Sequence, residues 1–202
     1  MSRIPPAIRD AAAEFDGLPG VGPRAALRFA YWLVTLPRER IRRFAQAVLA
    51  LSESVVRCSV CGMWSDKPVC SICSDPARDK HQLCVVATNQ DLQVIEESSA
   101  FKGVYHVLGG LLDPIEGRTP DTLAINELLK RLRAADSQIR ELILAFDPDV
   151  NGDTTALYLM NQLKGIPVTI SRLARGLPSG AQIEYADGAT VADALANRRN
   201  NT

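Results

Sequence analysis

The sequence contains 202 residues, 47% of them hydrophobic, with equal numbers of acidic and basic side chains. A chain of this size can bury a hydrophobic core and form one domain or two to three small modules. The N-terminus has no signal-peptide pattern and no apolar run approaches the length of a membrane span, so we expect a cytoplasmic protein with reduced thiols and no membrane contact.

The N-terminal part of the chain carries an excess of positive charge. Residues 1–57 contain nine arginines and five acidic residues. The spacing of apolar residues predicts three helices in this part, over residues 5–15, 23–34 and 37–56. The charge makes this part the better candidate for contact with phosphate, although a basic helical face is more often simply solvated.

A glycine-containing hairpin separates the first two predicted helices. Gly20 and Gly22 let the backbone approach a ligand closely, and their N–H groups lie beside the start of a helix, an arrangement that can bind phosphate. Arg24 and Arg28 are four residues apart and therefore share one face of that helix, within reach of neighbouring phosphates. The hairpin resembles a helix-hairpin-helix motif, which binds the DNA backbone regardless of base sequence; a tight turn with surface arginines is the alternative.

Four cysteines follow in two closely spaced pairs. Cys58 and Cys61 form one Cys-x2-Cys pair, Cys70 and Cys73 form another, and the short loop between the pairs can bring all four thiolates around one Zn²⁺. Four thiolates leave no open position for water, so we expect one structural zinc per chain; two disulfides or unrelated buried thiols are the alternatives. Cys84 opens an apolar run and is expected to be a buried strand residue.

The remainder of the chain alternates between strand and helix patterns. This alternation predicts an α/β fold with a mainly parallel sheet covered by helices on both faces. The predicted strands cover residues 83–87, 104–108, 142–146 and 168–171. The predicted helices cover residues 91–98, 120–135 and 153–163. The tail is expected to add one strand over 182–185 and a short helix over 192–197.

An acidic loop follows the third of these strands. Asp147 and Asp149 stand at its carboxyl end, where open α/β sheets place their sites, and Asp153 follows shortly after. These carboxylates could share a weakly bound Mg²⁺. Alternatively, Asp147 and Asp149 occupy a turn and Asp153 caps the next helix.

The order of these motifs resembles the bacterial RecR family of recombination mediators from about residue 4 to residue 199. The resemblance rests on the following segments: Leu18-Pro-Gly-Val-Gly-Pro-Arg24, the four cysteines with Val69-Cys70-Ser-Ile-Cys73-Ser74, Cys84-Val-Val86, Tyr105-His-Val-Leu-Gly-Gly110, Ala145–Ala156 and Gly176-Leu-Pro-Ser-Gly180. It implies a helix-hairpin-helix DNA-binding region, a four-cysteine zinc knuckle, a Rossmann-like Toprim domain and a C-terminal strand and helix tail that closes the subunit. The implied boundaries are 1–57, 58–80, 81–175 and 176–202.

The resemblance also implies a function. Members of the family assemble into ring-like tetramers that can encircle DNA, and they act with RecO, and in many bacteria RecF, to load RecA at single-stranded gaps during recombinational repair. We expect this chain to be such a DNA clamp and not an enzyme. We therefore expect sequence-independent DNA binding through Gly20, Gly22, Arg24 and Arg28, assembly into a dimer or tetrameric ring, and a nucleoid-associated location in the cytoplasm. The acidic loop would bind RecO or weak Mg²⁺.

Three places depart from the family pattern, and one of them is the loop Asp113-Pro-Ile-Glu-Gly-Arg-Thr-Pro120, which differs from the family's usual Gly-rich sequence. The family has a Glu just after the first Toprim strand, where this chain has Ala87, and its acidic loop reads Asn-Pro-x-x-Glu-Gly-Glu, where this chain has Asp147-Pro-Asp-Val-Asn-Gly-Asp153. The missing Glu removes a general acid or base, so a phosphoryl-transfer site is incomplete. A Mg²⁺-dependent Toprim enzyme that acts on DNA phosphodiesters is the alternative function.

Overall fold

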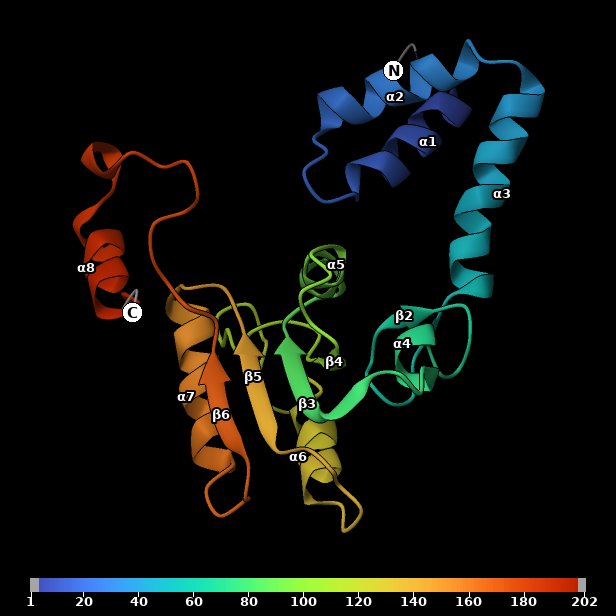
Figure 1. Ribbon diagram of the computed structural model, residues 1–202. Coiled ribbons are helices and arrows are strands. Elements are labelled where there is room, and N and C mark those ends of the chain that lie inside the picture. Colours follow the sequence, from blue (N-terminus) through green and yellow to red (C-terminus); the bar gives the residue numbers. More distant parts are fainter. Residues whose placement is uncertain (1–3, 200–202) are drawn as a thin grey trace. The chain divides into compact units, whose positions relative to one another are not determined.

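A computed structural model describes residues 4–199, which form two compact units (Figure 1). The helical unit ends at Val55 and the α/β unit begins at Val56. The outer ends of the first and last predicted domains, residues 1–3 and 200–202, lie outside the described residues. Within residues 4–199, each helix is too short or too polar to cross a membrane.

The helical unit is built from three helices. These are α1 (Pro6–Asp16), α2 (Pro23–Val34) and α3 (Arg38–Ser54). Proline lies at the start of α1 and of α2, where its missing N–H costs nothing. The two helices pack together, with the rings of Phe15 and Phe29 edge to face at 6.0 Å between centroids. The three predicted helices are thus present with boundaries close to those expected.

The α/β unit contains a four-stranded parallel sheet in the order β4-β3-β5-β6. Its strands are β3 (Asp79–Val86), β4 (Gly103–Val107), β5 (Glu141–Ala145) and β6 (Thr169–Arg172). The helices between them are α5 (Asn89–Glu97), α6 (Ile125–Arg133) and α7 (Val150–Gln162). The predicted alternation of strands and helices and the parallel sheet are confirmed.

Alternate residues of β3 face two different layers. Leu83 and Val85 pack in one buried cluster with leucines of α6 and α7. Cys84 and Val86 pack in a second cluster with Leu92 of α5 and three of the four paired cysteines. Because neighbouring strand residues point to opposite faces, α6 and α7 cover one face of the sheet while α5 and the cysteine-rich segment cover the other. Cys84 is buried, as expected for a strand residue.

Two predicted helix boundaries were wrong. The helix expected over 120–135 begins only at Ile125, because Thr119 and Thr122 form a turn through a hydrogen bond from the Thr119 N–H to the Thr122 hydroxyl. The helix expected from Asp153 begins earlier, at Val150. Its start is fixed by Asp149, whose carboxylate accepts a hydrogen bond from the Gly152 N–H.

The predicted tail strand over 182–185 was also wrong. This segment forms the 3-10 turn η1 (Ile183–Tyr185), because the N–H groups of Tyr185 and Ala186 bond to carbonyls three residues earlier rather than to a sheet edge. The tail helix α8 (Gly188–Ala196) starts before the predicted position, with Asp187 as its cap. It packs back on the chain after β6, where its following residue Asn197 donates a hydrogen bond to the carbonyl of Arg175.

Candidate zinc centre, DNA-contact hairpin and acidic loop

The four paired cysteines come together in the α/β unit. Their sulfur atoms all lie within 4.8 Å of one another, and Cys58, Cys61 and Cys70 are buried. Cys58 follows the short strand β1 (Val56–Arg57), which pairs antiparallel with β2 (Trp64–Ser65). Cys61 lies in the turn between these two strands. The second pair belongs to the short helix α4 (Ser71–Ser74): Cys70 is its cap and Cys73 lies within it.

Backbone hydrogen bonds fix the two cysteine turns. The Gly62 N–H donates to the Cys58 carbonyl at 2.9 Å, and Gly62 has a φ of 78°, a conformation that glycine adopts without strain. The backbone N–H groups of Cys70 and Cys73 point at sulfur, donating to Cys58 Sγ and Cys70 Sγ at 3.4 Å each. Such N–H donors stabilise the thiolate form that a metal requires.

The sulfur arrangement fits a tetrahedral zinc site and does not fit disulfides. The Cys61 and Cys70 sulfurs are 3.6 Å apart, well beyond the S–S bond length of about 2.05 Å. A hydrogen bond from Cys73 lowers the pKa of the Cys61 thiol to about 5, while the same contact raises the pKa of Cys73. Four cysteine sulfurs this close together form a donor set suited to one Zn²⁺.

The cysteine segment is joined to the sheet by direct contacts. The Val107 N–H at the end of β4 donates to the Cys61 carbonyl at 2.8 Å. The Trp64 N–H donates to the Asn89 side chain at 2.9 Å, which links β2 to the start of α5. The cysteines also share a buried cluster with residues of β3, β4 and α5. The candidate metal centre is therefore part of the core that covers one face of the sheet.

The predicted DNA-contact hairpin joins α1 to α2. Gly20 has a φ of 77°, and Gly22 caps α2 in an extended conformation without a side-chain hydrogen bond. A Cβ placed on either glycine would meet no atom within 4 Å, so the backbone here is open on the outside. The side chains of Arg24 and Arg28 are exposed on the helix that follows. Gly20 and Gly22 therefore lie just before α2, and Arg24 and Arg28 lie in its first half.

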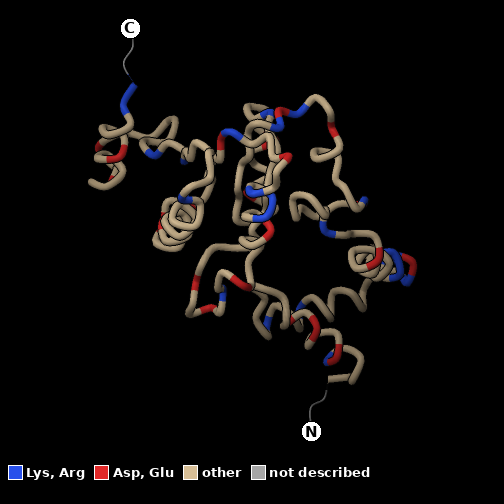
Figure 2. Tube along the Cα trace, turned by 90° about the horizontal axis from the view of Figure 1, so that it is seen from below, with Lys and Arg blue, Asp and Glu red and all other residues tan. Residues whose placement is uncertain are grey.

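The basic residues of the helical unit do not form one continuous stretch of positive charge. Figure 2 shows acidic residues interspersed with basic residues along the chain. Arg28 lies over the ring of Phe29 at 5.7 Å, and Arg40 lies over the ring of Trp32 at 5.9 Å. Specific arginine positions, rather than a broad basic face, are the candidates for phosphate contact.

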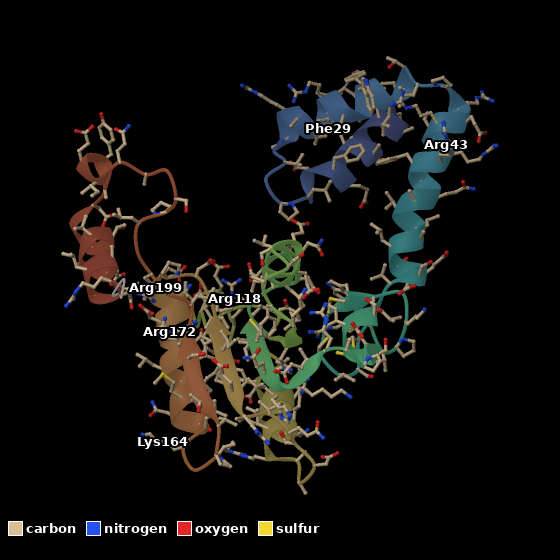
Figure 3. All side chains as sticks on the ribbon, viewed as in Figure 1. Phe29, Arg43, Arg118, Lys164, Arg172 and Arg199 are labelled. Atoms are coloured by element: carbon tan, nitrogen blue, oxygen red, sulfur yellow. The ribbon has the colours of Figure 1, made fainter. Side chains whose placement is uncertain are left out.

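Two of the three carboxylates in the acidic loop have contacts within the protein. Asp149 caps α7, and Asp153 forms ion pairs with Arg172 and Arg175, of which Figure 3 labels Arg172 at the end of β6. The pKa of Asp153 is lowered by its hydrogen bond from Arg175, which has the larger effect, and by its hydrogen bond from Arg172. Among the described residues, Asp147 has no side-chain hydrogen bond or ion pair. The loop therefore does not present three free carboxylates to a Mg²⁺.

Ala87, which stands where the family has a Glu, is buried just after the end of β3. Ala87 is 6% exposed, and its carbonyl accepts a hydrogen bond from the Gly109 N–H at 2.9 Å. The next residue, Thr88, caps α5 and forms a reciprocal capping box with Asp91. Ala87 itself thus supplies no general acid or base, and the carboxylate that lies nearest to it in sequence, Asp91, lines the same cavity as Asp147.

Sequence reasoning missed Arg172 and Arg175 as partners of Asp153. Both lie at or just beyond the end of β6, which pairs with β5 in parallel, so both strands end at the same edge of the sheet. The argument that placed the acidic loop at this edge also applies to the residues at the end of β6. That signal could have placed the two arginines at this edge before the structure, but their pairing with Asp153 depends on the strand order.

Comparison with known protein families gives four matches in chain order. The matching models are the RecR helix-hairpin-helix (residues 8–51), the RecR zinc finger domain with four cysteines (55–75), the Toprim domain (81–174) and the RecR C-terminal region (176–199). The chain is also similar to curated proteins along most of its length. One from Synechococcus sp. strain WH7803, named Recombination protein RecR, is 48% identical over 92% of both chains.

Two other relatives carry the same name. The protein from Acidothermus cellulolyticus is 44% identical, with 95% of this chain and 96% of the relative covered. The protein from Desulfosudis oleivorans is 41% identical, with 98% of each chain covered. The similarity therefore extends over both units and the tail.

Proposed function

The chain belongs to the RecR family of recombination proteins, and from that premise we propose that it is a non-enzymatic DNA clamp that mediates recombinational repair. In this proposal it acts with RecO, and with RecF where present, to load RecA at single-stranded gaps. The observation that carries the non-enzymatic assignment is the sheet edge, where Ala87 replaces a carboxylate and Asp149 and Asp153 are engaged within the protein.

We assign DNA binding to the hairpin and structural support to zinc. Gly20 and Gly22 would admit a phosphate to the backbone amides, and Arg24 and Arg28 would contact neighbouring phosphates. One Zn²⁺ would be held by the four paired cysteines in a closed site that does no chemistry. The proposed parts are the DNA-binding region 1–57, the zinc knuckle 58–80, the Toprim domain 81–175 and the closing tail 176–202.

We assign partner binding to the acidic loop. Asp147 is exposed and has no protein partner among the described residues, so it is free to meet a basic surface such as that proposed for RecO. Asp149 and Asp153 would support it by fixing the start of α7. Weak Mg²⁺ binding would have to rely mainly on Asp147, which is a poor site for a cation that prefers several oxygen ligands.

DNA binding tests the assignment of the hairpin. Because the contacts are to phosphate, affinity should be independent of sequence and should fall as salt rises. Arg24→Ala combined with Arg28→Ala should weaken binding to every DNA and reduce the salt slope by roughly 2, as expected for two lost phosphate contacts. Lys130→Ala combined with Lys164→Ala removes the same charge from the α/β unit and should leave affinity unchanged. Equal affinity in the two double variants would place the DNA site elsewhere.

A Mg²⁺-dependent cleavage and relaxation assay tests the alternative function. We expect intact DNA after incubation of the purified protein with plasmid and Mg²⁺. Reproducible nicking that disappears in a variant with Asp147, Asp149 and Asp153 all changed to Asn would establish an enzyme instead of a clamp.

A further inference from the structure

Arg131 of α6 is a partly buried cation without a carboxylate partner. Its Nη1 donates a hydrogen bond to the Tyr105 carbonyl at 2.7 Å. In the part of the chain that the structure describes, no Asp or Glu oxygen lies within 4.0 Å of its guanidinium. Glu127 one turn earlier and Asp136 beyond the helix form no ion pair with it. A cation taken out of water in this way needs compensating negative charge nearby.

The four cysteines are the main source of negative charge that acts on Arg131. Arg131 shares a cavity of about 410 Å³ with Cys73 and with Asp136, which forms no ion pair with it. Tyr105, which accepts the hydrogen bond from Arg131, lies in the buried cluster that contains Cys58, Cys61 and Cys70. Burial lowers the pKa of the Arg131 guanidinium, and negative charge on the four cysteine sulfurs acts in the opposite direction.

A zinc ion does not remove this negative charge. Four thiolates carry four negative charges and Zn²⁺ carries two positive ones, so the loaded centre keeps a net charge of about −2. Burying that charge beside the sheet is unfavourable unless a cation offsets it. Other cations near the cysteines are less enclosed: Lys80 and Arg57 are both exposed.

We propose that Arg131 is the positioning residue that offsets the charge of the zinc thiolate centre and couples α6 to it. This inference rests on the proposed zinc site. Arg131 reaches the centre from the helix layer on the opposite face of the sheet, by way of the Tyr105 carbonyl on β4. Zinc affinity would then depend on the α/β domain and not only on the cysteine turns, because groups outside the ligand set tune a metal site.

Zinc affinity of the full chain tests this inference. Arg131→Met keeps an unbranched apolar stem and removes the charge; Arg131→Lys restores a charge. Arg133→Met is the matched control, because Arg133 lies on the same helix, is exposed and makes only a 3.4 Å contact with the Gln162 carbonyl. Bound zinc is measured by mass spectrometry, and affinity by competition with a chromophoric chelator.

We expect zinc affinity to fall at least ~10-fold in Arg131→Met, partly recover in Arg131→Lys and remain unchanged in Arg133→Met. If Arg131→Met does not fold, Arg131→Gln replaces it, and its affinity should be below that of Arg131→Lys. Equal zinc affinity in the neutral variant and the wild type would overturn the role of Arg131. A folded wild type without zinc would instead refute the zinc site itself, so the two failures are distinguishable.

Discussion

Gly152 occupies a position in the first turn of α7 that no larger residue can fill without movement. A Cβ at this position would lie 2.0 Å from the Asp147 carbonyl oxygen. We expect Gly152→Ala to reduce the free energy of unfolding by roughly 2 kcal/mol, as overpacking does in other proteins. Gly188→Ala is the control, because Gly188 also lies in a first helical turn but a Cβ there meets nothing within 4 Å. Denaturant unfolding measures both, and equal stability of the two variants would contradict the crowding.

The ion pairs of Asp153 predict a dependence of stability on pH. Arg175 and Arg172 lower the pKa of Asp153 in the folded chain. A lowered folded-state pKa stabilises the protein above the unfolded value of about 3.9, and this contribution is lost as the pH falls through the folded-state pKa. Asp153→Asn should therefore lower the melting temperature slightly at pH 7, and the difference from the wild type should shrink as the pH falls below about 4.

A second carboxylate provides the control for that pH dependence. Glu184 is exposed in η1 and forms no ion pair with the described residues, so Glu184→Gln should leave the melting temperature unchanged across the same pH range. A difference between Asp153→Asn and wild type that stays constant from neutral pH down to about pH 3 would show that the ion pairs do not stabilise the loop.

The elements that could be predicted from sequence are those with a strong local pattern. Local spacing was enough to predict the alternating strands and helices, the paired cysteines and the glycine hairpin. The tail strand over 182–185 could not be predicted correctly, because a short segment with a strand-like pattern pairs with a sheet only if an edge is available to it. The start of α7 was misplaced for a different reason: Asp149, rather than Asp153, supplies its cap.

Contacts between distant segments could not be obtained from sequence spacing. The two arginines that bind Asp153, the hydrogen bond from Val107 to Cys61 and the enclosed position of Arg131 all join segments far apart in the chain. Each of these contacts depends on strand order, which a single sequence does not specify. They nevertheless determine which carboxylates remain free and how the metal centre is supported.

Bound zinc should stabilise strand β4 as well as the two cysteine turns. Cys58→Ser and Cys73→Ser should each abolish stoichiometric zinc and reduce the free energy of unfolding by more than ~4 kcal/mol, as loss of a structural metal does. Because Val107 donates to the Cys61 carbonyl, amide exchange in β4 should also accelerate. Cys84→Ala is the control: it lies in the same buried cluster outside the metal centre and should keep its zinc. Full zinc content in Cys73→Ser would exclude that residue as a ligand.

The helical unit as a whole leaves much of its apolar surface in water. Among its described residues only Ala26 and Ala30 are buried, whereas Trp32 is 53% exposed and Leu51 is 66% exposed. Three helices of this length form a thin core, which gains from contact with a second copy. We therefore expect the helical units to provide the surface through which the chain forms dimers or larger rings.

Assembly should in turn set DNA affinity. One hairpin offers few phosphate contacts, and linking several copies raises the effective concentration of each. Trp32→Glu with Leu51→Glu should reduce the mass of the assembly measured by light scattering and weaken DNA binding by at least ~10-fold, while the zinc content stays at one per chain. Ile115→Glu is the control, since Ile115 is 95% exposed in the α/β unit and lies outside the proposed surface. A monomeric variant that binds DNA as tightly as the wild type would show that a single hairpin suffices and that assembly serves another purpose.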